Sequence, residues 1–462
     1  MKQRVAVRGP ATAPGIRRIS VADEQLRTID DHRVATFYKG PLKVAPGQTR
    51  NKGFAVLRGP KIVDTQTLRA DAVKTDAQRG QTMGTSELDR RTALQILMAG
   101  GSATVLAGCS SPAGSASPSS ASAVLSASSI SVTDQRGKTA IFARPVTRVV
   151  TIPMPAASLL VAVDQSSDHL AAMHNVSWVA MRDGVMGTMF PRALDIPHDI
   201  AAQDFTPNVE SVRALNPDVV IQWSDAQLVE PLEKAGLTVI GLKNTGTQQD
   251  VDAWIAMFAA MLGKPERAVQ IKARSDQELA DIKSQAAART SKGPSVLYFN
   301  RFMGGLKVAG ANSYNDFYIK LIGATNPATG KDPLPGSGMI GLDVEQVLKW
   351  DPEVILLGNF DNAMPKDIYS DPVWQNVSAV RSRRVYKVPL GGYRWDPPGQ
   401  ESPLMWHWLA DIAFPQDKSP LRSKVGDYFR FLYNHEPTAD ELNKILWTSN
   451  NSVSANYQQF NA

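Results

Sequence analysis

The sequence predicts an α/β fold of two Rossmann-like lobes with parallel sheets, joined by one long rigid α-helix, with a ligand cleft between the lobes. Three observations support this prediction. Short runs of β-branched residues alternate with helical patterns along most of the chain, a pattern of 14 residues occurs twice, and an unbroken helical stretch lies between the two copies. Strands separated by helices favour parallel sheets, because each parallel pair needs a crossover connection.

The predicted strands are short apolar runs rich in Val and Ile. Such continuous runs are typical of strands that are buried on both faces of a parallel sheet. They cover residues 141–152, 169–173, 219–222, 239–242, 296–299, 354–357 and 385–388.

The repeated pattern runs from Asn208 to Ile221 and again from Asp343 to Leu356. Each copy begins with a residue that favours a helix N-cap, continues for two helical turns, stops at Pro217 or Pro352, and enters a predicted buried strand. Two copies 135 residues apart predict two similarly built lobes.

The connecting helix is predicted from Glu266 to Arg289, a stretch without Gly or Pro. A helix of this length, about 24 residues, spans roughly 36 Å, which is enough to link two lobes. The predicted domains are an N-terminal α/β lobe at 130–247, a helical connector at 248–292, a C-terminal α/β lobe at 293–417, and C-terminal helices with a tail at 418–462.

The basic charge of the chain is confined to its front. The 462 residues contain 50 Lys and Arg against 44 Asp and Glu, but residues 1–82 alone contain 16 against 7, and the chain from Cys109 onward contains 32 against 35. A nucleic-acid partner is therefore not predicted.

Residues 83–108 have the features of a cleaved export signal. A short polar start with Arg90 and Arg91 precedes an uncharged stretch that is shorter than the roughly 20 apolar residues needed to span a membrane. Leu106-Ala107-Gly108-Cys109 resembles the bacterial lipobox, in which the cysteine thiol carries the lipid. Arg90-Arg91 resembles the twin-arginine motif, so the Sec and twin-arginine routes both stay open.

Cys109 is the single cysteine, which excludes an intramolecular disulfide and a site of several thiolates. The tether at 109–129 is rich in Ser, Ala and Pro and has no core-forming pattern. We predict that a lipid on Cys109 anchors an extracytoplasmic protein to the cell membrane, in either type of bacterial envelope. Because residues 1–82 precede a complete signal, we expect Met83 to be the real start and 1–82 to be a non-native or disordered extension.

A series of motifs resembles the periplasmic binding proteins for iron-siderophores and cobalamin. It comprises the Glu-containing repeat helices, the segments LEKAGLTVI, LGKPERA, NSYNDF, GATN, DPVW and VYKVP, and the C-terminal segments YFRFLY and TADEL, in that order over about residues 130–446. The resemblance implies two lobes joined by a rigid helix, and a monomeric lipoprotein without an intrinsic cofactor that delivers a metal chelate to an ABC permease and its ATPase. It also implies that Glu210 and Glu345 dock to the permease.

Candidate ligand-binding residues are those that follow the predicted strands, because ligands of open parallel sheets lie beyond the carboxyl ends of the strands. Arginines can fork onto carboxylate or catecholate oxygens, and aromatic rings supply flat apolar faces. This chemistry favours a ferric siderophore or similar iron complex that brings its own metal ligands. The predicted binding residues are Arg301, Tyr393, Arg394, Trp223, Trp395, His174, Asn300 and Phe302.

Other functions stay open. Haem is an alternative ligand if Tyr393 or His174 is an axial ligand, and cobalamin is another. A ligand sensor or an α/β enzyme would share the fold, although the chain has no nucleophile elbow, P-loop, zincin or dinucleotide motif, so we predict that it is not an enzyme.

Overall fold

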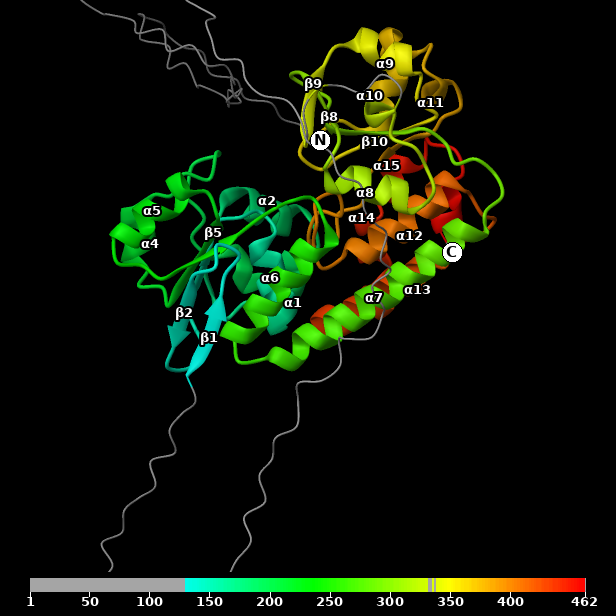
Figure 1. Ribbon diagram of the computed structural model, residues 1–462. Coiled ribbons are helices and arrows are strands. Elements are labelled where there is room, and N and C mark those ends of the chain that lie inside the picture. Colours follow the sequence, from blue (N-terminus) through cyan, green and yellow to red (C-terminus); the bar gives the residue numbers. More distant parts are fainter. Residues whose placement is uncertain (1–128, 331–334, 336–337, 462) are drawn as a thin grey trace, which may run out of the picture. The chain divides into compact units, whose positions relative to one another are not determined.

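The computed structural model describes residues 129–330, 335 and 338–461 (Figure 1). These residues belong to one compact unit, Gly114–Ala462. The predicted N-terminal extension, the export signal, Cys109 and the tether up to residue 128 lie outside the described residues. Within the described residues, no helix is both long and apolar enough to cross a membrane.

The N-terminal lobe contains a four-stranded sheet in which all strands are parallel, in the order β4-β3-β5-β6. The strands are β3 (Val149–Thr151), β4 (Leu170–Met173), β5 (Val219–Trp223) and β6 (Val239–Leu242), and the helices of this lobe are α1 (Ala156–Asp164), α2 (Asn175–Asp183), α3 (Met186–Met189), η1 (Pro191–Leu194), α4 (Val209–Ala214) and α5 (Ala226–Lys234). This arrangement confirms the predicted parallel α/β lobe.

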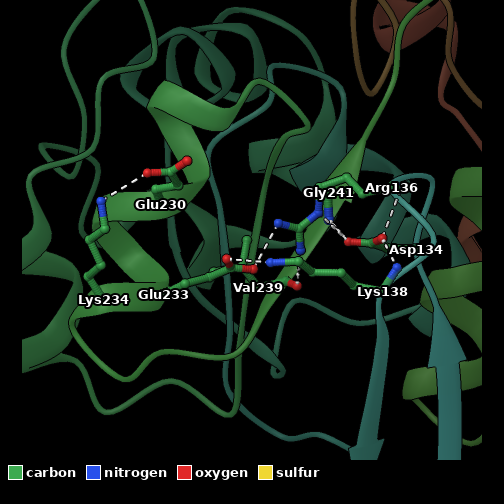
Figure 2. A network of polar contacts seen from close by, with 8 residues as sticks. All are labelled: Asp134, Arg136, Lys138, Glu230, Glu233, Lys234, Val239 and Gly241. Carbon is green, nitrogen blue, oxygen red and sulfur yellow. Dashed lines mark hydrogen bonds and ion pairs between the residues drawn. The ribbon is translucent and has the colours of Figure 1, made fainter.

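A hairpin of β1 (Ile130–Thr133) and β2 (Thr139–Phe142) precedes this sheet. One long strand was predicted at 141–152, but β2 and β3 are separate, with Pro145 between them. Figure 2 shows how the hairpin turn is tied to β6: Asp134 accepts a hydrogen bond from the Gly241 N–H (2.8 Å), and Arg136 donates to the Val239 carbonyl (3.0 Å). The turn therefore covers part of the open edge of the sheet.

The same turn is bound to helix α5 by ion pairs. Arg136 and Lys138 both contact the Glu233 carboxylate, at 2.8 and 2.7 Å (Figure 2). On the same helix, Glu230 and Lys234 form a separate exposed pair at 2.9 Å. The Glu233 pairs join the hairpin to the helix, whereas the Glu230 pair lies within the helix.

The C-terminal lobe contains a five-stranded sheet in the order β11-β10-β7-β8-β9. Strands β7 (Val296–Arg301), β10 (Val354–Leu357) and β11 (Val385–Lys387) are parallel, whereas β8 (Leu306–Ala309) and β9 (Met339–Leu342) are antiparallel to their neighbours. This sheet is therefore mixed and not purely parallel as predicted. The reversal occurs at Gly304 and Gly305, whose φ angles of 71° and 120° suit a tight turn that glycine adopts readily.

The internal repeat is confirmed as two capped helices that lead into strands. The Asn208 side chain accepts a hydrogen bond from the Ser211 N–H (3.2 Å) at the start of α4, before β5. The Asp343 side chain accepts one from the Gln346 N–H (2.9 Å) at the start of α9 (Val344–Trp350), before β10. Both helices thus begin where the N-cap residues predict.

The predicted connecting helix is α7 (Pro265–Ala288), with 24 residues. It packs against α6 (Gln248–Met261) and α12 (Ser402–Ala413) (Figure 1). Burial alone would raise the pKa of Glu278 on this helix, but a hydrogen bond with His407 (2.7 Å) and the nearby cations of Lys424 and Arg274 lower it to about 2. This buried ion cluster attaches α7 to α12 and the C-terminal helices.

The buried apolar residues of the described chain form two clusters, one on each face of the C-terminal sheet. Alternate residues of β7 divide between them: Val296 and Tyr298 belong to the larger cluster, and Leu297 and Phe299 to the smaller. The larger cluster continues through α12, α7 and α6 to the N-terminal sheet.

The remaining elements are α8 (Tyr314–Leu321), η2 (Pro327–Thr329), α10 (Pro365–Ser370), η3 (Pro372–Trp374), α11 (Ser378–Arg381), α13 (Leu421–Tyr433), α14 (Ala439–Ile445), α15 (Thr448–Asn451) and η4 (Tyr457–Phe460).

Candidate ligand-binding site

Arg394 lies in the loop that follows β11 and contacts both lobes. The loop folds back on itself so that Leu390 pairs with Arg394 in an antiparallel bridge. The Arg394 guanidinium donates from Nε to the Asn359 carbonyl (3.1 Å), just after β10, and from Nη1 to the Val176 carbonyl (3.0 Å), in the first turn of α2. It also lies over the Phe360 ring, 4.8 Å from the ring centre.

The Arg394 side chain is buried, and none of the described carboxylates pairs with it. Only 7% of the residue is exposed, and among the described residues its hydrogen bonds go to backbone carbonyls and to no Asp or Glu. A buried cation is costly unless an anion or several polar groups compensate it. The guanidinium is therefore suited to receive an anionic oxygen of a ligand.

Tyr393 lies next to Arg394 in the loop and is also buried. The residue is 1% exposed, and its hydroxyl has no hydrogen-bond partner among the described residues. Burial raises the pKa of Tyr393 to about 12, so the hydroxyl keeps its proton at neutral pH. The Arg394 guanidinium carbon lies 5.6 Å from the Tyr393 ring centre, and together the two side chains offer several donors to ligand oxygens.

Two buried charged residues hold the loop after β10 in position. Asp396 accepts hydrogen bonds from the Tyr298 hydroxyl (2.6 Å) and from the Asn359 backbone N–H (3.0 Å). Lys387 donates to the carbonyls of Gly358 (2.8 Å) and Asp361 (2.6 Å), and burial lowers its pKa to about 8. The backbone that carries Asn359 and Phe360 is thus fixed from two sides.

A pair of cations lies on the neighbouring hairpin of β7 and β8. Arg301 and Lys307 are cross-strand partners, and both are exposed. Like charges in directly opposite positions repel each other, which favours an anionic ligand between them. The Asp361 carboxylate joins this hairpin to the loop after β10 by accepting hydrogen bonds from the N–H groups of Phe302 and Met303, both at 2.7 Å.

Lys307 is not among the predicted binding residues because the sequence pattern does not predict strand β8. The signal available was the Gly-Gly pair between two short apolar runs, which is typical of a hairpin. Asn300 is half-buried on β7, next to Arg301. The predicted residues that the structure places at the carboxyl ends of β7 and β11 are Asn300, Arg301, Tyr393 and Arg394.

His174 has no free ring nitrogen for a ligand. It is 1% exposed and caps helix α2: Nδ1 accepts from the Val176 N–H (3.0 Å), and Nε2 is 2.8 Å from the Ala202 carbonyl, to which it donates. Burial lowers the pKa of His174 and favours the neutral ring. His174 is therefore not part of the binding surface that we propose.

Three predicted aromatic residues lie against the apolar core. Trp395 is fully buried, and its Nε1 donates to Glu401 (2.6 Å). The Phe302 ring packs against Phe299 and Trp374, with ring centres 5.4 and 5.1 Å away. Neither Trp395 nor Phe302 is part of the proposed binding surface. Trp223, at the end of β5, is half-buried with Phe205 and Trp254 edge-on at 6.2 and 5.9 Å.

Glu210 and Glu345 are both exposed, in the first turns of α4 and α9. Their side chains thus occupy equivalent places in the two halves of the repeat.

Two surface hollows of about 410 and 200 Å³ lie on the N-terminal lobe, where both are lined by Asp195, Ile196 and Pro197. None of the predicted ligand-binding residues lines either hollow. Within the described part of the chain, no group of three His, Cys, Asp or Glu side chains is placed to hold a metal ion.

Two α/β lobes, one long connecting helix and charged side chains at the carboxyl ends of strands are the features of a two-lobed solute-binding protein. The chain belongs to the periplasmic binding protein family, which matches residues 201–390. A periplasmic solute-binding protein of Veillonella parvula is 30% identical, with a TM-score of 0.64 over 70% of this chain and 99% of the other. The resemblance predicted from the sequence is confirmed.

More distant relatives are named for different ligands. The molybdate-binding protein MolA of Haemophilus influenzae is 22% identical over 65% of this chain and 90% of its own length. The iron(3+)-hydroxamate-binding protein FhuD of Bacillus subtilis is 24% identical over 43% of this chain and 64% of its own length. The chain is accordingly a substrate-binding protein of an ABC importer, and not an enzyme. Proteins of this class are extracytoplasmic and work with a membrane permease and its ATPase.

Proposed function

We propose that this protein captures a metal chelate with anionic or polarised oxygen atoms, a ferric siderophore or similar iron complex, and delivers it to the permease. The observation that supports this proposal is the adjacent pair of Tyr393 and Arg394. Both are buried, the Tyr393 hydroxyl has no partner among the described residues, and Arg394 pairs with no described carboxylate.

The donor chemistry favours a chelate. Guanidinium and hydroxyl groups donate hydrogen bonds to oxygen atoms, whereas a bare metal ion needs electron-pair donors. A chelate supplies its own metal ligands and presents its outer oxygens to the protein. Arg301 and Lys307 add positive charge at the same edge of the sheet, and Phe360 adds an apolar ring. The iron(3+)-hydroxamate relative supports iron as the metal.

A small oxyanion such as molybdate is the second candidate. The Tyr393 and Arg394 donors suit a tetrahedral oxyanion as well, and the relative that matches 65% of this chain is named for molybdate. Haem and cobalamin are further alternatives. Because both ring nitrogens of His174 are bonded, Tyr393 is the one of the two predicted axial ligands that is left for a bound haem.

We further propose that Glu210 and Glu345 dock to cations of the permease. They are exposed, and they lie on equivalent helices of the two lobes. Acidic side chains on both lobes let a partner detect their spacing. We also propose that Cys109 carries a lipid that keeps the protein at the cell membrane.

A ligand panel tests the proposed function. Purified protein is titrated with a ferric trihydroxamate, ferric citrate, molybdate, haemin and cobalamin, and tryptophan fluorescence reports binding. We expect saturable binding of a ferric chelate, with at least a hundredfold weaker binding of the metal-free chelator. Saturation by molybdate alone would replace the iron proposal by the oxyanion alternative, and binding of haemin alone would replace it by the haem alternative.

A further inference from the structure

The loop that carries Tyr393 and Arg394 is folded over a buried carboxylate. Glu401, immediately before α12, is 2% exposed. Its Oε2 accepts a hydrogen bond from Trp395 Nε1 (2.6 Å), and its Oε1 accepts one from the Tyr433 hydroxyl on α13. The backbone N–H groups of Gly392 and Tyr393 also stabilise its charged form. Four donors, three of them from the loop, therefore converge on one side chain.

The loop backbone lies directly against this carboxylate at two glycines. A Cβ atom on Gly391 would lie 1.9 Å from Glu401 Oε2, and one on Gly392 would lie 2.8 Å from Oε1. Real Cβ atoms do not approach other atoms this closely, so a side chain at either position would displace the loop or the carboxylate. The shape of the loop therefore depends on direct backbone contact with Glu401.

The same loop contacts helix α2 of the N-terminal lobe near both of its ends. The Gly391 carbonyl accepts a hydrogen bond from the Val185 N–H (3.0 Å), two residues after α2. Arg394 donates to the Val176 carbonyl in the first turn. A change in the shape of the loop would therefore alter both its contacts with α2 and the position of the Arg394 guanidinium.

We infer that Glu401 is a positioning residue whose ionised carboxylate holds the Leu390–Trp395 loop in its ligand-binding conformation, and whose protonation weakens ligand binding. This inference rests on the proposed binding role of Tyr393 and Arg394. The physical reason is the type of its partners. The indole and the two backbone N–H groups can only donate hydrogen bonds, and an ionised carboxylate accepts them through both oxygens. Protonation turns one of these oxygens into an O–H donor, so the carboxyl group can no longer accept from all of its partners equally well.

The surroundings of Glu401 place the protonation of its carboxylate near neutral pH. Burial raises the pKa of Glu401 to about 7, although hydrogen bonds from Tyr433 and Trp395 offset part of the increase. Among the described residues, Glu401 forms no ion pair.

The tyrosines around Glu401 do not gain or lose a proton near neutral pH. Burial raises the pKa values of Tyr433 and Tyr428 on α13 and of Tyr393 in the loop, so these hydroxyls stay protonated. Two arginines lie nearby: Arg267 on α7, which donates to the Phe431 carbonyl (2.6 Å), and Arg394 in the loop. Arginine side chains do not lose their proton in proteins. Met186 of α3 and Gln400, which also border the site, carry no charge.

A first experiment needs no ligand. The indole N–H resonance of Trp395 is followed by NMR between pH 5.5 and 8.5 in the mature protein. We expect it to titrate with a midpoint near 7. The titration should be absent in Glu401→Gln and should move to higher pH in Tyr433→Phe, which removes one donor to the carboxylate. A flat resonance in the wild type, or an unchanged midpoint in Tyr433→Phe, would overturn the inference.

A second experiment measures binding of a ferric trihydroxamate to the wild type and to Glu401→Gln at each pH from 6 to 8. The ratio of the two affinities cancels any change in the chelate itself. We expect the wild type to bind at least tenfold more tightly than the variant at pH 8, with a difference that shrinks toward pH 6. A ratio that is constant with pH would contradict the inference.

The matched control is Glu278→Gln, which neutralises another buried carboxylate, one whose pKa of about 2 lies far below the tested range. Its pH profile should match the wild type. If Glu401→Gln does not fold, Tyr433→Phe serves in its place, with an affinity profile whose midpoint moves to higher pH. If Trp395 titrates but no ferric probe binds, the proposed ligand class fails while the positioning role is tested with the ligand that the panel finds.

Discussion

Arg394 donates a hydrogen bond to the Val176 carbonyl at 3.0 Å, so a side chain of the C-terminal lobe ends on the first turn of α2 in the N-terminal lobe. Its Nε is bonded at the same time to Asn359 of its own lobe (3.1 Å). A ligand anion at this guanidinium would add a third partner to a group that already joins the two lobes. In the proposed site, ligand binding and the contact between the lobes are therefore linked through one residue.

The role of His174 as a helix cap makes a prediction about stability. His174→Ala removes the side-chain acceptor for the Val176 N–H, and loss of an N-cap typically costs about 1 kcal/mol. His174→Asn, which keeps a capping acceptor, should recover most of this loss. Denaturant unfolding measures both variants. Neither should lose affinity for the bound chelate by more than about twofold, and a tenfold loss in both would show that His174 contacts the ligand.

The Arg301 and Lys307 pair makes a prediction about salt dependence. Exposed cations attract an anionic ligand by a field that salt screens. Neutralising both residues to Gln should lower the affinity for a ferric chelate and make the remaining affinity less sensitive to salt between 20 and about 300 mM. Arg422→Gln, on α13, is the control for loss of an arginine and should behave as wild type. Equal salt slopes in the double variant and the wild type would exclude these cations from the site.

Much of the fold was predictable because its signals are local. Capping residues, prolines and apolar runs lie next to one another in the sequence, so the repeat helices and α7 were predicted close to their observed ends. Strand β8 was missed because four residues that alternate Leu-Lys-Val-Ala carry little periodic signal.

The site was predictable only in part because position after a strand does not determine where a side chain points. Tyr393, Arg394 and Trp395 are consecutive, yet Arg394 reaches the other lobe while Trp395 turns into the core toward Glu401. His174 follows β4 as predicted, but it is used to cap α2. These outcomes depend on contacts with residues that are distant in the sequence, which local patterns do not encode.

The docking role of Glu210 and Glu345 predicts a separation of binding from uptake. Replacing both by Ala should leave ligand affinity and thermal stability close to wild type, because both side chains are exposed. Stimulation of the reconstituted importer ATPase should fall to the level without binding protein. Glu230→Ala, which removes an exposed glutamate from α5, is the control and should stimulate normally. Full stimulation by the double variant would rule out the docking role.

The proposed lipid anchor predicts a change of fractionation. Cys109→Ala removes the thiol that would carry the lipid, so the exported protein should move from the membrane fraction to the soluble fraction. Labelling with a fatty-acid analogue should mark the wild type and not the variant. Membrane retention of unlabelled Cys109→Ala would show that another feature holds the protein there.

The most direct test of the central claim is the affinity of Arg394→Met for the ferric chelate that the wild type binds. Methionine keeps much of the apolar stem and removes the guanidinium, and loss of a charge-assisted hydrogen bond typically costs about 1.5–3 kcal/mol, or roughly tenfold or more in Kd. We predict at least a tenfold weaker Kd, measured by isothermal titration calorimetry, for a variant whose circular dichroism matches the wild type. A folded Arg394→Met protein that binds the chelate with the wild-type Kd would contradict the assignment of the site.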